Sequence, residues 1–176
     1  LNQRAWGDDS NDHSIDQIGN ENVANADIYN GGNFGILVQE GDRNSGRMVQ
    51  SGTGNSSVIL QTGDDNYAYS TSTAGSDNVT GIVQGIPGSV PGMSGMQSIN
   101  TPISFLNTSG SVATLGVKGS GNEAGILQIG LNNSAGSNPQ YQGAKGISIE
   151  GDDNTAGIAQ LGFGNSANIS VLGSSN

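Results

Sequence analysis

Asparagine and glutamine are the polar residues with the most regular spacing in this 176-residue chain. Asn recurs every 11 residues, with a slip of one residue before Asn78, and Gln often follows six residues after an Asn. The members of these two sets are Asn11, Gln17, Asn22, Asn33, Gln39, Asn44, Gln50, Asn55, Gln61, Asn66, Asn78, Gln84, Asn122, Gln128, Asn133, Asn154, Gln160, Asn165 and Asn176. A carboxamide both donates and accepts, so identical amides stacked about 4.8 Å apart form a hydrogen-bonded ladder. The spacing therefore predicts amide ladders that run from rung to rung along a stack of repeats.

Groups that could catalyse a reaction are scarce. His13 is the sole histidine, and the absence of Cys removes disulfides, thiolate catalysis and thiolate metal sites. The sequence contains no G-x-S-x-G, Walker or paired-histidine motif. Tyr67 and Tyr69 alternate with Ala68, which favours outward strand residues over a sugar-binding platform. We therefore expect no enzyme, no catalytic residue and no cofactor.

Two acidic corners, Asp64-Asp65 and Asp152-Asp153, could hold calcium, which favours clustered carboxylate oxygens. Asp also favours turns, and outward charges keep an assembly soluble. The calcium-binding solenoid motif is a nonapeptide, which does not match an 11-residue period. The turn interpretation is therefore favoured, and no metal site is expected.

The residues between Asn and Gln alternate in a way that predicts short β-strands. The second position after each Asn is mostly small and the fourth is mostly large. A period of two places this set on one face of a strand. A Gly usually stands three residues before the Asn, and Gly and Asn supply the positive φ angles of a sharp reversal. One unit, N-x-A-x-I-x-Q-x-G-x-x, is therefore a strand followed by a corner.

Such a strand cannot bury its inner face alone. Two strands joined by a corner form an arch whose sides meet about 10 Å apart, so that one rung contains 22 residues. The predicted fold class is all-β: a β-solenoid of stacked 22-residue β-arch rungs with two facing parallel sheets, amyloid-like in its cross-β stacking. Small residues facing large ones fill a thin core without large aromatic side chains.

Breaks in the period divide the chain. The expected organisation is an N-terminal arm or weak first strand at 1–10, repeats at 11–84, an insertion or degenerate rung at 85–110, and repeats at 111–176. Three of the four prolines fall within 85–110, and proline cannot donate to a ladder. If the first strand follows the phase of the repeat, Arg4 and Trp6 take inward positions. A second break follows Asn133, where a unit of ten residues brings Lys145 to an inward position.

The outward positions of one sheet carry an apolar stripe. Its members are Phe34, Ile36, Val38, Val58, Leu60, Val79 and Val83. A stripe of this size exceeds the usual scatter of surface hydrophobes. Either the insertion or a second filament covers it, and we favour the insertion because it is apolar and follows directly in the sequence.

Charge and composition exclude several classes of protein. A formal charge of −10 has the wrong sign for gripping nucleic acid phosphates. The chain has no apolar run of the ~18–20 residues that a membrane span needs, and its first residues lack the design of a signal peptide. Only 32% of residues are hydrophobic, but 11% charged residues and four prolines are too few for typical disorder. We expect a chain that is soluble or already processed, and that neither binds nucleic acid nor inserts into a membrane.

The repeat resembles that of curlins, the subunits of bacterial curli fibres. The most similar stretches are QSGTGNSSVILQTGDDN (Gln50 to Asn66), GSGNEAGILQIGLNNSA (Gly119 to Ala135) and AGIAQLGFGNSANI (Ala156 to Ile169). The resemblance implies a mature subunit exported through an outer-membrane pore, which forms extracellular, cell-surface amyloid fibres of a biofilm matrix, in some cases with a nucleator subunit. On this resemblance the Asn and Gln positions are ladder residues for assembly. About fourteen recognisable units and a 26-residue interruption leave open whether the chain is a major subunit, a nucleator or a distant relative.

Polymerisation also follows from the repeat itself. A solenoid without polar caps exposes strand edges that recruit further chains, and neither end of this sequence has such a cap. Asn176 stands where the repeat would place an Asn before Leu1, which predicts head-to-tail stacking in near-continuous register. The alternatives are a monomeric β-solenoid that binds a surface such as ice or polysaccharide, and an adhesin segment of a larger chain.

Overall fold

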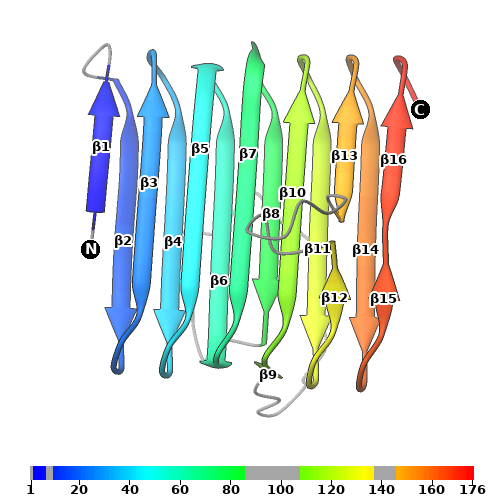
Figure 1. Cartoon of the computed structure of the whole chain (residues 1–176). Helices are drawn as coiled ribbons and strands as arrows, with labels where there is room; N and C mark the ends of the chain where they lie inside the picture. Colours follow the sequence, from blue (N-terminus) through cyan, green and yellow to red (C-terminus); the bar gives the residue numbers. More distant parts are fainter. Residues whose placement is uncertain (1, 7–9, 86–107, 137–145) are drawn as a thin grey trace, which may run out of the picture.

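The computed structural model describes residues 2–6, 10–85, 108–136 and 146–176, which form strands and the turns that join them (Figure 1). The first sheet contains β1 (Asn2–Trp6), β3 (Val23–Tyr29), β5 (Ser45–Thr53), β7 (Tyr67–Ser76), β10 (Val112–Lys118), β12 (Ser134–Ala135), β13 (Ile147–Glu150), β15 (Ser166–Ala167) and β16 (Ile169–Leu172). The second sheet contains β2 (Asp12–Ile18), β4 (Phe34–Glu40), β6 (Ser56–Asp64), β8 (Val79–Gln84), β9 (Thr108–Ser109), β11 (Glu123–Ile129) and β14 (Thr155–Leu161).

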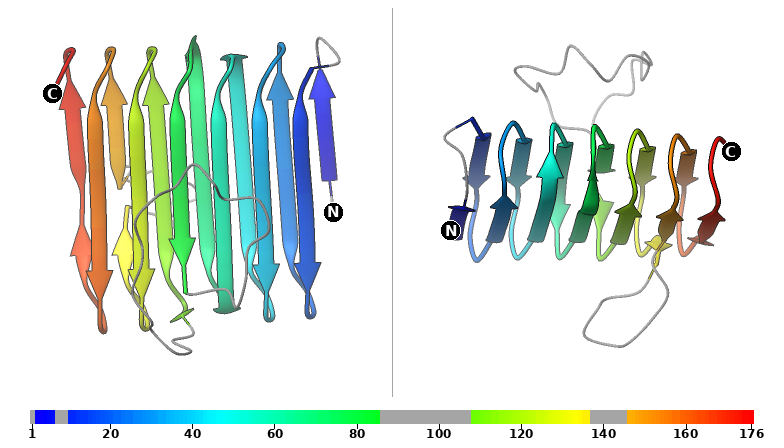
Figure 2. Two further views of the ribbon diagram at one scale, coloured as in Figure 1. Left: turned by 180° about the vertical axis from the view of Figure 1, so that it is seen from behind. Right: turned by 90° about the horizontal axis from the view of Figure 1, so that it is seen from above.

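Strands β1 to β8 alternate between the two sheets, and so do the later layers β10, β11, β12 with β13, β14, and β15 with β16. Each strand pairs in parallel with the strand one rung away. In the second sheet Asp12 lies opposite Phe34, 22 residues along, and Phe34 lies opposite Ser56. In the first sheet Val23 lies opposite Ser45. Seen along the strands, the rungs form one row, with the two sheets face to face (Figure 2). The predicted β-solenoid of 22-residue rungs with two parallel sheets is confirmed.

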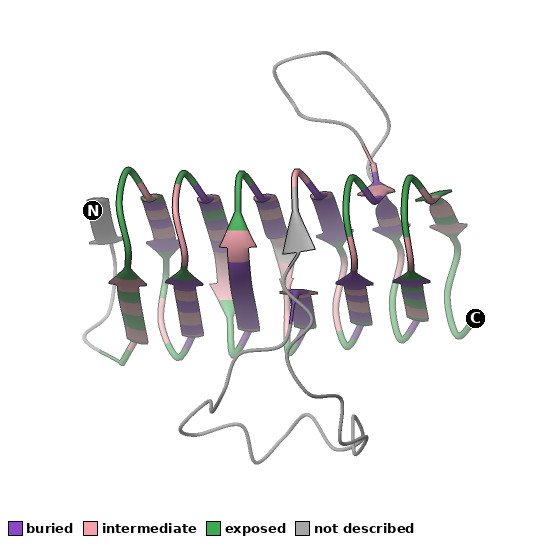
Figure 3. Cartoon of the chain, turned by 90° about the horizontal axis from the view of Figure 1, so that it is seen from below, coloured by how far each residue is buried: buried purple, intermediate pink, exposed green. Residues whose placement is uncertain are grey.

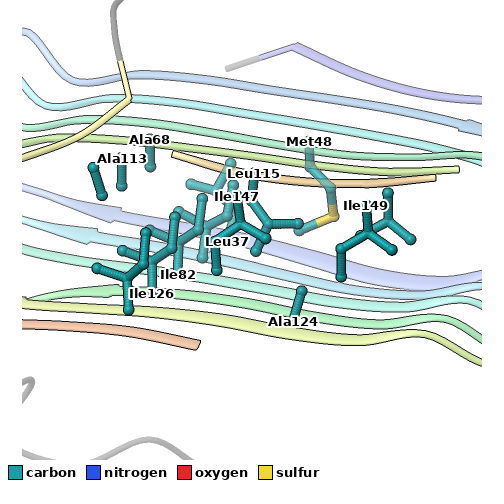
Figure 4. Packing of buried hydrophobic residues seen from close by; sticks show 14 of the residues in the cluster. Leu37, Met48, Ala68, Ile82, Ala113, Leu115, Ala124, Ile126, Ile147 and Ile149 are labelled. Carbon is teal, nitrogen blue, oxygen red and sulfur yellow. The ribbon is translucent and has the colours of Figure 1, made fainter. Parts of the chain in front are cut away.

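The core is the thin layer between the sheets, because side chains in each strand point alternately inward and outward. Burial alternates accordingly along most strands (Figure 3). Leu37, Ile82 and Leu115 are completely buried and pack in rows along the stack (Figure 4). Small residues leave the space for these rows: a Cβ atom added to Gly46 would lie 3.1 Å from Leu37 Cδ1 in the facing sheet.

The corners need glycine because the backbone of neighbouring rungs comes into contact there. Gly41 has a φ of 119°, a conformation that residues with a side chain rarely adopt. A Cβ at this position would lie 2.1 Å from the carbonyl oxygen of Gly63 in the next rung. The Gly of the repeat is therefore required by both conformation and space.

The solenoid continues directly across the first break in the period. Strand β7 pairs with β10, and β8 pairs with β11, so no rung lies between them. Thr108 and Ser109 lie opposite Gly63 and Asp64 and rebuild the corner before β10. The segment 86–107 lies outside the described residues. Its packing over the apolar stripe therefore stays a prediction.

The apolar stripe is unevenly buried. Val58 and Leu60 are 7% and 2% exposed although they occupy outward positions of β6. Val79 on the neighbouring β8 is 41% exposed. The stripe is therefore buried at its centre and open at this edge.

The prediction of a ten-residue unit after Asn133 is wrong. Ala135 of β12 lies opposite Ala113 of β10, and Ile147 of β13 lies opposite Leu115, only two residues further along the same strand. The two short strands therefore form a single layer, interrupted between residues 136 and 146. Glycine permits the interruption, because a Cβ at Gly136 would lie 2.4 Å from the Gly146 nitrogen. Lys145 lies outside the described residues.

The predicted register of the first strand is also wrong by one residue. Asn2 pairs with Asn25, so that Arg4 lies opposite Asp27 and Trp6 opposite Tyr29, in outward rows. A shift of one residue moves every side chain to the other face of a strand.

Candidate functional site

The predicted Asn residues form two continuous rows, one at each side of the stack where the chain turns. The row at the corners that lead into the second sheet contains Asn11, Asn33, Asn55, Asn78, Asn122, Asn154 and Asn176. The row at the corners that lead into the first sheet contains Asn22, Asn44, Asn66, Asn133 and Asn165. The structure thus brings together every Asn of the predicted set.

Each Asn in the interior of a row links three rungs, as Asn55 illustrates. Its backbone N–H and its Nδ2 both donate to Oδ1 of Asn33 in the preceding rung, over 3.0 and 3.1 Å. Its own Oδ1 accepts from the backbone N–H and Nδ2 of Asn78 in the following rung, over 3.2 and 2.9 Å. Asn55 is completely buried. These rows therefore satisfy the backbone donors that the tight corners would otherwise leave unpaired.

Ser111 completes the second row and was missed as a ladder residue. Its N–H donates to Asn66 Oδ1 over 3.2 Å, and its hydroxyl oxygen accepts from the N–H of Asn133 over 3.3 Å. The signal was its position on the 11-residue phase, one unit before Asn122. A hydroxyl replaces the amide here because the essential function is to accept the N–H of the next rung.

The Gln ladder belongs to one sheet only. Nε2 of Gln39 donates to Oε1 of Gln61 over 2.8 Å, and Nε2 of Gln61 donates to Oε1 of Gln84 over 2.9 Å. The complete row in the second sheet is Gln17, Gln39, Gln61, Gln84, Gln128 and Gln160. Gln61 also donates to the carbonyl oxygen of Ser45 over 3.2 Å, so the row ties the two sheets together.

Gln50 differs from the other predicted Gln residues because it lies in the first sheet. Its neighbours in the row are Ile28 and Ser72, neither of which is an amide. Its Nε2 donates to the carbonyl oxygens of Phe34 and Asn55, whereas its buried Oε1 has no partner. Gln50 thus bridges the sheets without continuing a ladder.

The ladders have a direction. Each ladder Gln donates to the Gln of the next rung toward the C-terminus, whereas each Asn backbone N–H donates toward the N-terminus. At one end of the stack, Gln17 is half-buried and no described residue donates to its Oε1. At the other end, the Ser134 carbonyl oxygen is the only described acceptor of Gln160 Nε2, over 3.1 Å, so one hydrogen of this amide has no partner among the described residues. The two ends are therefore complementary.

The Asp carboxylates at the corners accept hydrogen bonds from backbone N–H groups of the neighbouring rung. Oδ1 of Asp42 accepts from the N–H of Asn20 over 2.7 Å, and Oδ1 of Asp64 accepts from the N–H of Asp42 over 2.8 Å. Within the described ranges, no group of three or more His, Asp or Glu side chains could hold a metal ion. These carboxylates therefore act as corner caps.

Charged and aromatic side chains on the outside pair from rung to rung. Nε and Nη2 of Arg43 donate to Oδ1 and Oδ2 of Asp65, over 2.7 and 2.9 Å. Hydrogen bonding to Arg43 lowers the pKa of the Asp65 carboxyl. Burial, and to a lesser extent the neighbouring Tyr69, raises the pKa of Tyr67. The Arg47 guanidinium lies 5.9 Å from the centre of the Tyr69 ring, within cation–π range. These contacts repeat the stacking of the ladders on the outer face.

Comparisons with known proteins agree with the repeat geometry. Residues 41–73 and 151–176 match the family described as curlin associated repeat. No curated protein and no solved structure matches the chain. The described residues include no helix long and apolar enough to cross a membrane. The predicted resemblance is confirmed, and the chain therefore contains curlin associated repeats.

Proposed function

We propose that this chain is a secreted structural subunit that polymerises end to end into extracellular amyloid-like fibres of a biofilm matrix. The observation that carries the proposal is the complementarity of the two ends: within the described ranges, a donor of Gln160 and the acceptor of Gln17 have no partner. Curlin repeats are the repeats of a structural amyloid subunit, which supports a structural rather than enzymatic role.

Unpaired strand edges give a second reason for polymerisation. In the part of the chain described here, β2 and β14 each pair on one side only. Such edges present free N–H and C=O groups that template another strand. A second copy satisfies both edges, which no small ligand can do.

The partners follow from this role. The chain itself is the principal partner, and export through an outer-membrane pore and growth from a nucleator subunit belong to the same proposal. The nineteen predicted Asn and Gln residues then serve assembly through the ladders, with Gln50 as a link between the sheets. No cofactor takes part.

Binding of a flat surface such as ice has less support. The five candidate Thr residues are Thr71, Thr73, Thr80, Thr114 and Thr155. Thr80 takes an inward position beside Ser57, whereas Thr71 and Thr114 occupy different outward rows. A repeated Thr array is therefore missing from the described strands, and polymerisation is the better explanation.

Electron microscopy of the purified chain after incubation in neutral buffer tests the proposal. We expect unbranched fibres whose growth is accelerated by preformed seeds. A chain that stays monomeric and folded at high concentration, with or without seeds, would refute polymerisation and favour surface binding.

A further inference from the structure

The two sheets carry different inner rows, so they are not interchangeable at an end. In the second sheet, every described strand except the short β9 carries a Gln six residues after its corner Asn. The first sheet has an aliphatic residue near both ends of the same row. From β3 onward its members are Ile28, Gln50, Ser72, Val117, Ile149 and Val171, and β1 aligns Ala5 with Ile28. A second copy therefore meets one amide row and one largely apolar row.

The free amide groups select which sheets meet. If like sheets stack, Gln160 Nε2 of one copy donates to Gln17 Oε1 of the next, as in every internal step. If unlike sheets stack, Gln17 meets Val171, and its amide oxygen is buried without a donor. Burying an unpaired amide is costly, whereas pairing it extends the ladder. The second sheet of one copy thus continues into the second sheet of the next.

When like sheets stack, the first sheet has room for one strand fewer than the two copies supply. When β2 of the next copy pairs with β14, a single layer remains between β13 and the β3 strand of the next copy. Two strands compete for that layer: β16 of the first copy and β1 of the second. One of them has to leave.

The residues in the inner rows of the first sheet favour β16 over β1 as the strand that occupies this layer. Strand β16 contributes Ile169 and Val171 to the inner rows that contain Ala26 and Ile28. Strand β1 aligns Gln3 with Ala26 in the same row. Ile169 buries more apolar area than Gln3, so β16 gains more from this position.

We propose that β1 occupies a docking site on β3 that receives β16 of a second copy, so that polymerisation proceeds by strand exchange. This inference rests on the proposed function. The partner is a second copy of the chain, with like sheets in contact. Strand β1 delays polymerisation until the exchange takes place.

Disulfide formation between two mixed variants tests the arrangement, because the chain has no native Cys. Asp16 and Ala159 lie in one outward row of the second sheet, and Asp27 and Ser170 lie in one outward row of the first. Paired strands bring such positions about 4.8 Å apart, within disulfide range. In fibres grown from mixtures, Asp16→Cys with Ala159→Cys, and Asp27→Cys with Ser170→Cys, should both form dimers on oxidation. Dimers from Asp16→Cys with Ser170→Cys instead would mean that unlike sheets stack and would overturn the proposal.

An intramolecular lock tests the exchange itself. Arg4 and Asp27 are register partners, so the double variant Arg4→Cys, Asp27→Cys should hold β1 on β3 when oxidised. We expect fibre growth to slow at least tenfold and to recover on reduction. The matched control is Val49→Cys, Thr71→Cys, which links β5 to β7 away from the docking strand and should grow equally fast in both states. Equal growth of the oxidised and reduced Arg4→Cys, Asp27→Cys chain would refute the exchange, whereas absence of fibres from the unmodified chain would refute polymerisation itself.

Discussion

Asn55 is the clearest test of the ladders at the scale of single residues. Asn55→Ala removes the Oδ1 that accepts from both Asn78 donors. The buried backbone N–H of Asn78 then loses its acceptor, and Asn78 Nδ2 keeps only the Gly119 carbonyl oxygen. We expect the free energy of unfolding to fall by about 1–3 kcal/mol or more, and fibre growth to slow. Urea denaturation measures the first effect and seeded growth the second. Ser14→Ala, on the exposed outer face of β2, should change neither, and equal effects of the two substitutions would contradict the register.

Gln61 and Gln50 allow the same residue type to be compared in two environments. Gln61→Met interrupts the Gln39 and Gln84 bonds and leaves their amides partly unpaired. Gln50→Met leaves no ladder broken and removes a buried oxygen that already lacks a partner. The loss of stability in urea should therefore be larger for Gln61→Met, by about 1 kcal/mol or more. A larger loss for Gln50→Met would mean that the bridge between sheets matters more than the ladder.

Tyr67 predicts a dependence of stability on alkaline pH. Its pKa is raised in the folded chain, first by burial, from an ordinary value of 10.0. The unfolded chain therefore loses this proton at lower pH than the folded chain, so the stabilisation present below pH 10 is lost as the pH rises further. Denaturation experiments at a series of pH values between 9 and about 12 measure this effect. The free energy of unfolding should fall less steeply with pH for Tyr67→Phe than for the unmodified chain. Identical slopes would show that Tyr67 titrates normally.

At the scale of corners and strands, Gly41 and Gly157 form a matched pair. Gly41→Ala places a Cβ 2.1 Å from a backbone oxygen at a φ of 119°, so we expect a loss of more than about 2 kcal/mol. Gly157→Ala places a Cβ no nearer than 3.9 Å to Gly125 O on the outer face of β14 and should be neutral or slightly stabilising. Thermal denaturation of the two variants provides the comparison, and similar losses would contradict the corner geometry.

The segment 86–107 can be removed without changing the phase of the repeat. Joining Gly85 to Thr108 produces the sequence Q-G-T-S-G-S, which has the spacing of Q-T-G-D-D-N at Gln61 to Asn66. Because β7 already pairs with β10 and β8 with β11, we expect the deletion variant to fold and to form fibres. Circular dichroism and electron microscopy test this. Loss of β structure would indicate that the segment is needed for folding.

Most of the fold was predictable because the same residue types recur at a fixed period. Asn, Gly and the alternating inner positions specified the strands, the corners and the parallel stacking. The sequence did not reveal that Ala135 and Ile147 share one layer, because a ten-residue interruption nearly imitates one repeat unit. It also did not separate Gln50 from Gln61, because each of them stands six residues after an Asn. The two differ in their register neighbours, since those of Gln50 are Ile28 and Ser72 rather than Gln.

For the whole molecule, charge is the main force that opposes assembly. Every copy has a formal charge of −10, so copies that approach end to end repel each other. Added salt screens this repulsion, with a Debye length of about 10 Å at 0.1 M and 3 Å at 1 M. We expect fibre growth monitored by light scattering to accelerate severalfold between these concentrations. Growth that slows with added salt would mean that attraction between opposite charges dominates the contact.

The central claim is that each copy stacks its rungs onto those of the next along one axis. Fibre X-ray diffraction of aligned samples measures this directly. The account predicts a sharp meridional reflection near 4.8 Å, parallel to the fibre axis, and an equatorial reflection near 10 Å from the two facing sheets. A 4.8 Å reflection perpendicular to the fibre axis, or fibres without it, would contradict end-to-end stacking of the solenoid.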